Sequence, residues 1–386
     1  MRSGTLGAGV SASQNFRPVH QGLEERLACF HDEVKRDFDG INRIAIAIYD
    51  PTTDILKSFV DSSEGDNPFE HAVARLAELK PLATLARTGG RRVINDLATH
   101  VPGTPAHARR LLEAGYLSSY TVPIFHKGTF HGFIFFNSFQ PGYFTPPVVQ
   151  RLRPVAEVVS LHTIMELDAV RMIQAAVETV RQISRARDEE TGAHLERMAH
   201  YTRMIALRLA PRRGLSDEWV EFLFQFAPLH DVGKIAVPDH ILFKPGRLTD
   251  EEFAIMKTHV AKGCEIVDTM AKTFRIGGAP YVRVLRNVVA HHHEAIDGSG
   301  YPHGLAGESI SLEGRITAVA DVFDALTSER PYKRAWSIDE ALDYLAEQAG
   351  KKFDKDAVDI LRDNRAAIAD IRNQFAESAS AESVPS

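Results

Sequence analysis

Residues 288–304 read VVAHHHEAIDGSGYPHG, and this stretch decides which kind of domain the C-terminal half forms. Three successive histidines after an apolar run cannot all face solvent on a regular helix, because successive side chains point in different directions. The glycines that follow give the backbone the freedom to bring Tyr301 close to a ligand. The stretch therefore predicts histidines turned inward at the end of a helix, beside a tight loop.

A second informative segment lies upstream at residues 221–234, EFLFQFAPLHDVGK. Its His230-Asp231 pair directly follows an apolar helix. Burial of an imidazole and a carboxylate there would be costly unless they were paired or bound to a metal. Taken alone, the dipeptide is more simply explained as a capping or hydrogen-bonded pair, so it needs support from other segments.

Further carboxylates and histidines occur on other predicted helices. Glu190 and His194 are four residues apart in 188–210 and share one face, and His259 ends the helix 251–259. Asp321 and Asp324 sit in the apolar helix 316–327, where an unpaired carboxylate would be expensive. Each alone fits an ordinary surface or core residue. Together they indicate a di- or trinuclear centre of iron, manganese or a similar metal rather than a cysteine-type zinc site.

The composition limits the number of domains and the class of protein that this chain can form. A chain of 386 residues and 42.8 kDa favours two domains, and 44% hydrophobic with 25% charged residues exclude a disordered or fibrous chain. Two cysteines exclude a disulfide framework and favour a reducing compartment. A net charge of -6 and a pI near 6.3 do not suggest nucleic-acid polymers or anionic membranes as partners. Without an apolar membrane stretch or signal peptide, the expected location is the cytoplasm.

Residues 20–148 alternate between strand and helix patterns and predict an α+β domain with helices on an antiparallel sheet. Strands are expected at 42–51, 55–63 and 91–96, and a hairpin at 118–138 with its turn at 126–128. Helices are expected at 24–38 and 106–115, and a helical stretch at 71–90 interrupted at Pro81. The histidines of this domain lack ligand-like spacing and are interpreted as surface residues: His71, His100, His107, His126 and His131.

Residues 149–187 form one long helical pattern that connects this domain to an all-α domain over residues 188–375. Val170, Ile173, Val177 and Val180 alternate spacings of three and four, which is typical of a short coiled-coil seam. The connector could therefore dimerise and transmit a signal, or simply pack as an amphipathic helix on its own domain. The small, polar segments 1–19 and 376–386 are expected to be disordered.

The ordered set of motifs in residues 186–375 resembles the HD-GYP phosphodiesterases, a bacterial branch of the HD metal-hydrolase superfamily that cleaves cyclic di-GMP. The N-terminal segment resembles a GAF sensor domain in its element order and hairpin. The motifs that carry the first resemblance are Glu190-x-x-x-His194, His230-Asp231-x-Gly-Lys234, His259, His292-His293-Glu294, Asp297-Gly-x-Gly-Tyr-Pro, and Asp321 with Arg330-Pro-Tyr-Lys333.

The resemblance implies a role for each matching position. It makes Asp231 a bridging ligand and lets Glu190 support a third metal, with iron the expected metal and manganese the alternative. Lys234 would neutralise the scissile phosphate. Independently of the resemblance, Glu294 and Asp324 are expected to orient the histidines, because carboxylates or carbonyls usually hold the second nitrogen of a metal-bound imidazole. The implied metal ligands are Glu190, His194, His230, Asp231, His259, His292, His293 and Asp321, and the implied substrate contacts are Lys234, Gly300, Tyr301, Arg330 and Lys333.

The function implied is hydrolysis of cyclic di-GMP to pGpG, GMP or both, regulated by the GAF-like domain. The implied assembly is a homodimer formed through the connecting helix and the GAF-like domain, which could also bind an unknown small ligand. One alternative is a phosphodiesterase for a mixed cyclic GMP-AMP dinucleotide. Another is a non-catalytic nucleotide-responsive module, which predicts a missing ligand position, and none is missing from the sequence.

Overall fold

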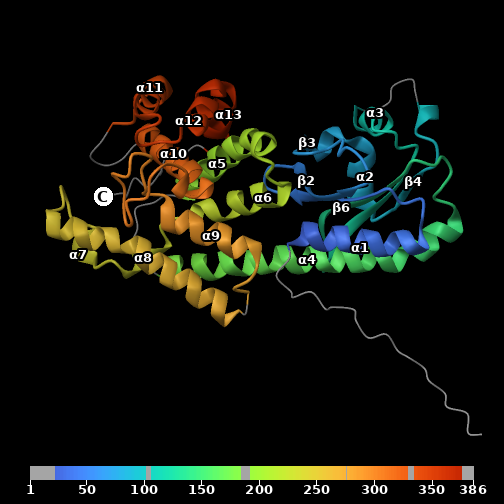
Figure 1. Cartoon of the computed structure of the whole chain (residues 1–386), viewed down its shortest axis with the longest axis horizontal. Coiled ribbons are helices and arrows are strands. Elements are labelled where there is room, and N and C mark those ends of the chain that lie inside the picture. The colour runs from blue at the N-terminus through green and yellow to red at the C-terminus, as the bar shows by residue number, and fades with distance from the viewer. Residues whose placement is uncertain (1–21, 101–105, 184–191, 275, 329–333, 376–386) are drawn as a thin grey trace, which may run out of the picture.

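The computed structural model describes residues 22–100, 106–183, 192–274, 276–328 and 334–375. Two lobes lie along one long helix, α4 (Pro146–Ile183), which passes beneath both of them (Figure 1). The segments 1–19 and 376–386, predicted to be disordered, lie outside the described residues. Across the described part of the chain, we find no helix with both the length and the apolar character needed to span a membrane.

The N-terminal lobe contains one six-stranded sheet with the strand order β3-β2-β1-β6-β5-β4, in which every neighbouring pair is antiparallel. With its covering helices it confirms the predicted α+β class. The strands are β1 (Arg43–Asp50), β2 (Ile55–Ser63), β3 (Val73–Arg75), β4 (Arg92–Ile94), β5 (Ser118–His126) and β6 (Thr129–Ser138).

Alternation along β1 explains how the sheet is covered. Ile44, Ile46 and Ile48 join the main core cluster with residues of α1 (Leu23–Asp37) and α4, whereas Ala47 belongs to a separate small cluster. Helices α2 (Lys80–Thr88) and α3 (Ala106–Glu113) supply residues to the small clusters. The sheet therefore has a fully packed face toward α1 and α4 and a more loosely covered face toward α2 and α3.

The prediction for residues 71–90 was partly wrong. Residues 73–75 form strand β3, which pairs with β2, and a 3-10 turn (Leu76–Glu78) precedes α2. Pro81 lies in the first turn of α2, where its missing N–H costs nothing, so it begins a helix instead of interrupting one. Pairing with the sheet edge outweighed the helical spacing of the apolar residues. By contrast, the hairpin turn is as predicted, with Lys127 and Gly128 at φ angles of 48° and 80°.

Three histidines of this lobe are not surface residues as predicted, and one of them, His107, lines a cavity with its Nδ1 buried. His131 is buried on β6, and its Nδ1 lies 3.2 Å from a guanidinium nitrogen of Arg171 on α4. The His71 side chain is 8% exposed, and its Nδ1 lies 2.6 Å from a carboxylate oxygen of Asp217 in the C-terminal lobe. Sequence spacing could not reveal either contact, because both partners are distant in the chain.

The C-terminal lobe consists of helices and loops in its described residues, as predicted. Its α-helices are α5 (Gly192–Arg213), α6 (Asp217–Phe226), α7 (Asp239–Leu242), α8 (Asp250–Thr273), α9 (Pro280–His291), α10 (Leu312–Thr327), α11 (Ile338–Gln348), α12 (Lys355–Asp363) and α13 (Arg365–Gln374). Short 3-10 turns are η4 (Ala227–Leu229), η5 (Val232–Ala236) and η6 (Gly307–Ser309).

Helix α4 continues through Pro154 without a break. The coiled-coil seam expected on this helix is occupied by the chain itself, since Val170 and Ile173 are only 3% and 2% exposed and belong to the main core. The side chains of Val177 and Val180 lie outside the described residues. At Val170 and Ile173, the structure therefore agrees with the simpler alternative, in which an amphipathic helix packs on its own chain.

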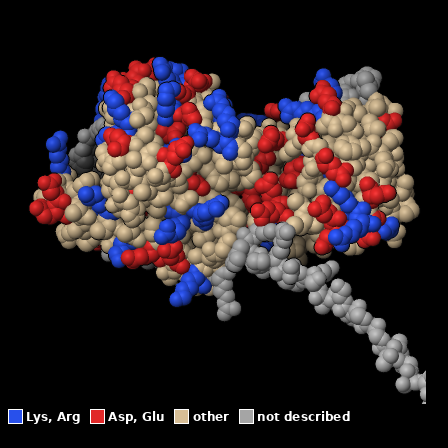
Figure 2. Space-filling view, in the orientation of Figure 1, with Lys and Arg blue, Asp and Glu red and all other residues tan. Residues whose placement is uncertain are grey.

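The two lobes contact each other through α6, which presents three carboxylates to the N-terminal lobe. Glu221 pairs with Lys57 on β2 at 2.5 Å, and Asp217 binds His71. Glu218 accepts a hydrogen bond of 2.9 Å from the backbone N–H of Leu23, the first residue of α1. Figure 2 shows acidic side chains gathered where the two lobes meet on this face.

Glu218 makes stability depend on pH near neutrality. Burial raises its pKa to about 7, well above the ordinary value of 4.5. The protonated form of Glu218 is therefore favoured in the folded state. Its contribution to the free energy of unfolding is fully present below pH 4.5 and is lost as pH rises to about 7. At about 1.4 kcal/mol per pKa unit, the loss is on the order of 3 kcal/mol.

We therefore expect Glu218→Gln, which keeps an oxygen acceptor for Leu23, to gain stability over the natural chain as pH rises from 4.5 to 8. Urea unfolding at several pH values measures this difference. Glu265→Gln, at a side chain that is 65% exposed, is the matched control and should follow the natural chain. Parallel stability curves for Glu218→Gln and the natural chain would contradict the assignment of a raised pKa.

Candidate metal centre

The site begins where α6 ends. Helix α6 runs directly into η4, and η4 into His230 and Asp231, so the lobe contact and this dyad share one continuous stretch of backbone. Turn η5 follows and packs against α8. A side chain at Gly233 would place its Cβ 1.9 Å from the carbonyl oxygen of His259, so only glycine permits this approach.

The Asp231 carboxylate lies at the middle of the site. Its Oδ1 lies 3.1 Å from His259 Nε2 and 3.5 Å from His292 Nε2. Its Oδ2 lies 3.2 Å from His230 Nε2 and 2.7 Å from Lys234 Nζ. One carboxylate therefore faces two groups of side chains, which is the geometry a bridging ligand requires.

Four side chains on this side of the carboxylate come close enough to hold a metal ion. Asp231, His259, His292 and His293 each offer a ligand atom, and these atoms all lie within 4.8 Å of one another. His259 comes from α8, whereas His292 and His293 follow α9. The structure thus gathers residues separated by up to 62 positions, from 231 to 293, into one group.

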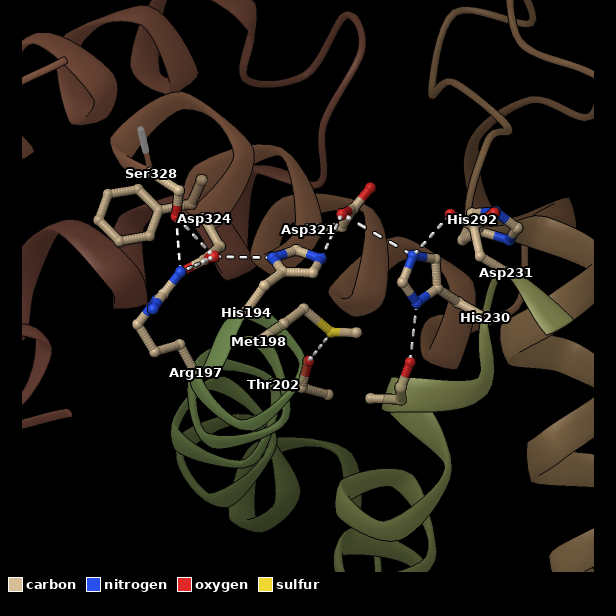
Figure 3. Close-up of polar contacts among 12 residues, drawn as sticks. His194, Arg197, Met198, Thr202, His230, Asp231, His292, Asp321, Asp324 and Ser328 are labelled. Atoms are coloured by element: carbon tan, nitrogen blue, oxygen red, sulfur yellow. Dashed lines mark hydrogen bonds and ion pairs between the residues drawn. The ribbon is translucent and has the colours of Figure 1, made fainter. Parts of the chain in front are cut away.

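A second group adjoins the first across His230. The Oδ1 atom of Asp321 on α10 lies 3.8 Å from both His230 Nε2 and His194 Nε2. Figure 3 shows Asp321 between these two imidazoles, with Asp231 and His292 beyond His230. The described predicted ligands therefore form one continuous row from His194 to His293.

Backbone carbonyls fix the tautomers of three histidines. The Nδ1 atom of His230 lies 3.0 Å from the Ala227 oxygen, that of His259 lies 2.8 Å from the Met256 oxygen, and that of His292 lies 3.0 Å from the Val289 oxygen. Because a carbonyl only accepts, we assign the proton to Nδ1 in each ring. The Nε2 lone pairs then point toward the carboxylates, which also offer only lone pairs.

His194 is held in a different way. Its Nδ1 lies 2.7 Å from Asp324 Oδ2, while its Nε2 faces Asp321. Asp324 is fully buried and also accepts from Arg197 at 2.7 Å and 2.9 Å and from Ser328 at 3.0 Å. Asp324 therefore orients His194, as the sequence led us to expect.

The charges of the site favour cation binding. Burial lowers the pKa values of His292 and His293, so both imidazoles are neutral. Burial alone would raise the pKa of Asp231, but the nearby charge of Lys234 helps to hold it well below the ordinary value. Neutral imidazoles and ionised carboxylates are the protonation states that bind divalent metals.

The donor set therefore fits a divalent metal centre. Several Nε2 lone pairs face carboxylate oxygens at 3.1–3.8 Å, an arrangement that is repulsive unless a cation lies among them. Asp231 Oδ1 is buried and receives no hydrogen bond from any described residue. Mixed imidazole and carboxylate ligands suit iron, manganese and related ions.

A glycine-rich loop places an aromatic ring beside the site. The Tyr301 ring centroid lies 4.6 Å from that of His293, and the Tyr301 N–H donates to the His293 oxygen at 3.0 Å. A Cβ on Gly300 would come within 2.3 Å of the Ala295 nitrogen, so the loop can fold back only with glycine here. Burial raises the pKa of Tyr301, which keeps its phenol protonated.

Not every predicted residue can be placed, and one expectation was wrong. Glu190, Arg330 and Lys333 lie outside the described residues. Glu294 does not orient a histidine; it accepts from the backbone N–H groups of His303 and Leu305 at 2.8 Å and 2.9 Å. The loop needs these bonds, and the paired histidines are already held by carbonyls.

Two side chains beside Tyr301 were not predicted from the sequence. Phe253 on α8 is 45% exposed, and its ring lies 6.1 Å from that of Tyr301. The Lys257 ammonium lies 5.2 Å and 5.9 Å from the centroids of these two rings. Their spacing of four on one helix could have linked Phe253 and Lys257 to each other, but only the fold brings them to Tyr301.

A family model and several known proteins match the part of the chain that contains this site. The family model described as HD domain matches residues 178–357. The chain is 48% identical over 201 residues to the cyclic di-GMP phosphodiesterase response regulator RpfG of Xanthomonas campestris, covering 51% of this chain and 50% of the relative. It is 43% identical over 176 residues to the 3'3'-cGAMP-specific phosphodiesterase 2 of Vibrio cholerae, covering 46% and 32%.

Two solved structures each match a part of the chain. A phycocyanobilin-bound GAF domain from a cyanobacterial phytochrome matches with 16% identity and a TM-score of 0.31, over 37% of this chain and 85% of that one. A cyclic GMP-AMP-specific phosphodiesterase from Vibrio cholerae matches with 20% identity and a TM-score of 0.34, over 46% of each chain. The chain spans about half the length or less of the curated relatives it matches.

Proposed function

We propose, from the premise that residues 178–357 form an HD domain with a divalent metal centre, that this chain is a cyclic di-GMP phosphodiesterase. The observation that carries the proposal is the Asp231 carboxylate, which faces a histidine group on one side and His230 with Lys234 on the other. The names of the relatives from Xanthomonas campestris and Vibrio cholerae support the same substrate class.

Each residue has a defined part in this proposal. Those that would hold the metals are His194, His230, Asp231, His259, His292, His293 and Asp321, with Glu190 able to support a third ion. Bound divalent cations neutralise phosphate charge and lower the pKa of water. Iron is our first choice and manganese the second, because both accept mixed imidazole and carboxylate ligands.

Side chains beside the metal centre would orient the substrate. Lys234 lies 2.7 Å from Asp231, and its flexible side chain would let the ammonium reach an incoming phosphodiester. Tyr301, beside His293, offers an aromatic face and a protonated phenol to the dinucleotide. Arg330 and Lys333, proposed from the sequence, would supply further positive charge to the phosphates or guanine edges.

The decisive experiment measures turnover by the full chain loaded with Fe(II) without oxygen, or with Mn(II). We expect cyclic di-GMP to be converted to pGpG, GMP or both, as measured by chromatography, with metal content measured in parallel. Fully loaded protein that leaves cyclic di-GMP intact would overturn the proposal. If it also binds the dinucleotide, a non-catalytic module would be the better description.

A mixed cyclic GMP-AMP dinucleotide is the second candidate substrate. It is favoured by the 43% identity to a relative that is named specific for 3'3'-cGAMP. Competition between the two dinucleotides in one reaction decides between them, and we expect cyclic di-GMP to be consumed first.

Phe253 should act on substrate binding and leave the chemistry unchanged. Its exposed ring next to Tyr301 can stack on a purine, and stacking of a base on an aromatic ring contributes about 1–3 kcal/mol. We therefore expect Phe253→Ala to raise KM for cyclic di-GMP about tenfold. Hydrolysis of bis(p-nitrophenyl) phosphate, which has no purine, should be unchanged.

The matched control for this prediction is Ile255→Ala. Ile255 lies on the same helix and is 41% exposed, but no ring contact links it to Tyr301. Equal rises in KM for both variants, or equal losses on both substrates, would argue against a stacking role.

We also propose that the chain forms a homodimer through α4. Four apolar side chains with heptad spacing are exposed on this helix: Val158 (43%), Leu161 (55%), Met165 (60%) and Met172 (57%). They differ from the seam expected from the sequence, since Val170 and Ile173 are buried in the chain's own core.

Introducing charge into this stripe should separate the dimer. We expect the natural chain to have twice the mass of 42.8 kDa in light scattering, and Leu161→Glu with Met165→Glu to be monomeric. Phe274→Glu, at an exposed apolar side chain directly after α8 and far from the stripe in sequence, serves as the control and should stay dimeric. A monomeric natural chain would exclude this assembly.

We propose further that the N-terminal lobe regulates the site as a GAF-like sensor. The support is the contact through α6, since this helix continues into His230 and Asp231. A change in the lobe that shifts α6 would therefore shift a bridging carboxylate. Activity measured with and without a ligand of the lobe tests the regulation and gives its sign.

A further inference from the structure

The N-terminal lobe contains a cavity of about 290 Å³ on the sheet face that is turned toward α2 and α3. It lies between two small apolar clusters that do not merge. One is centred on Leu56, Leu82 and Phe133, and the other on Leu97, Leu111 and Tyr116. Leu56, Leu82, Leu97 and Leu111 all line the cavity, so the gap between the clusters is the cavity itself.

Charged and polar groups along one side of the cavity pair with other groups of the protein. Arg43 pairs with Asp61 at 2.5 Å and donates to Asn137 at 2.9 Å. Asn137 in turn donates to the Ser119 hydroxyl at 3.0 Å. Lys57, also in the wall, pairs with Glu221 of α6. The positive charges on this side are therefore neutralised within the protein.

The positive charges of Arg92 and Arg110, which also line the cavity, have no carboxylate partner among the described residues. Arg92 is half-buried on β4, and none of the described residues provides it with a carboxylate partner. The neighbouring segment 101–105, VPGTP, contains no acidic residue either. Burial lowers the pKa of Arg92, which agrees with a charge that lacks compensation, and it also lowers the pKa of His107, so that this imidazole is neutral.

Among the described residues that line the cavity, four buried polar atoms lack a hydrogen-bond partner, and two of them, Arg43 Nε and Asp61 Oδ2, belong to the ion pair above. Within the described part of the chain, Arg92 Nε and His107 Nδ1 have no hydrogen-bond partner. A buried donor that is left unsatisfied costs free energy, so such groups normally meet an acceptor. Both residues line the same cavity, and an acceptor placed in it could serve both.

We propose that this cavity binds a small organic anion. Its carboxylate or phosphate would lie against Arg92, His107 and Arg110, and its apolar body between the two leucine-rich clusters. A volume of about 290 Å³ suits one aromatic ring or a short acyl chain with an acid group, and is too small for a cyclic dinucleotide. The site is therefore distinct from the metal centre in place and in ligand.

Titration calorimetry of the full chain tests the ligand class with four probes of similar size. The anions are phenylacetate and phenyl phosphate, phenylacetamide is neutral, and phenethylamine is a cation. We expect at least one anion to bind ten or more times tighter than the amide, and the amine not to bind. The tighter anion identifies carboxylate or phosphate. Equal binding of amide and anions, or no binding by any probe at millimolar concentration, overturns the proposal.

A pair of neighbouring arginines provides the matched variants. We expect Arg92→Gln to weaken anion binding about tenfold or more, because a hydrogen bond to a charged group is lost, and to leave amide binding unchanged. Arg91→Gln changes the preceding residue, which faces Glu157 on α4 at 3.5 Å, and should bind as the natural chain does. If Arg92→Gln does not fold, Arg110→Gln on α3 takes its place. Unchanged anion binding by the variant used overturns the proposal.

Discussion

Asp231→Asn is expected to abolish hydrolysis of cyclic di-GMP and to empty the metal centre. The natural carboxylate faces His259 and His292 with one oxygen and His230 and Lys234 with the other. Asparagine keeps the shape but removes the charge and turns an N–H₂ group toward imidazole lone pairs. Loss of several kcal/mol of charge stabilisation corresponds to a fall in kcat/KM of about 10³-fold or more.

Metal analysis and kinetics on the same preparation check this result, and a melting curve shows that the variant is folded. Asp268→Asn is the matched control, because Asp268 also lies on the C-terminal lobe but is 56% exposed and pairs only with Arg286 among the described residues. It should keep natural metal content and activity. An Asp231→Asn variant that retains both would show that another residue bridges the site.

Asp324→Asn should cause the largest loss of stability. The carboxylate is fully buried and makes two hydrogen bonds with Arg197, which is itself only 5% exposed. Removing one partner of such a pair leaves a buried charge without compensation, which costs about 3–5 kcal/mol. His194 loses its anionic acceptor as well, so metal affinity should fall about 10–100-fold.

Urea unfolding and metal titration measure the two effects of this substitution separately. The double variant Arg197→Met with Asp324→Leu should be more stable than Asp324→Asn, since no charge remains buried. A loss below about 1 kcal/mol for Asp324→Asn would contradict the proposed role of the pair.

The same carboxylate gives a pH dependence of known sign. Burial tends to raise the pKa of Asp324, but hydrogen bonds from His194 and Arg197 lower it below the ordinary value of 3.8. Its contribution to stability is therefore present above pH 3.8 and is lost as pH falls through the lower folded-state value. Asp324→Asn should accordingly lose less stability on acidification than the natural chain.

Local patterns in the sequence predicted much of the fold. The alternation in β1 and the turn at residues 126–128 depend on neighbours in the chain, so they could be recognised directly. Residues 73–75 could not, because their strand exists only through pairing with β2. The burial of Val170 and Ile173 likewise depends on a core assembled from distant segments.

The candidate site divides in the same way. The His230-Asp231 dyad and the histidines after α9 stood out because ionisable groups next to apolar runs need a reason to be there. The partners that orient them are less visible, since Asp324 reaches His194 across 130 positions and Arg197 across 127. Phe253 could not be recognised from the sequence, because a single exposed aromatic residue on a helix is common.

Helix α6 limits how chains of this kind can be recombined. Asp217, Glu218 and Glu221 are matched by an imidazole, a backbone amide and a buried ammonium from the N-terminal lobe. A foreign domain grafted at α4 would not provide partners for these acids. The resulting loss of stability would affect α6, the helix that precedes His230. A working chimera must therefore transplant the complementary face along with the fold, and adjusting the length of the junction alone would not suffice.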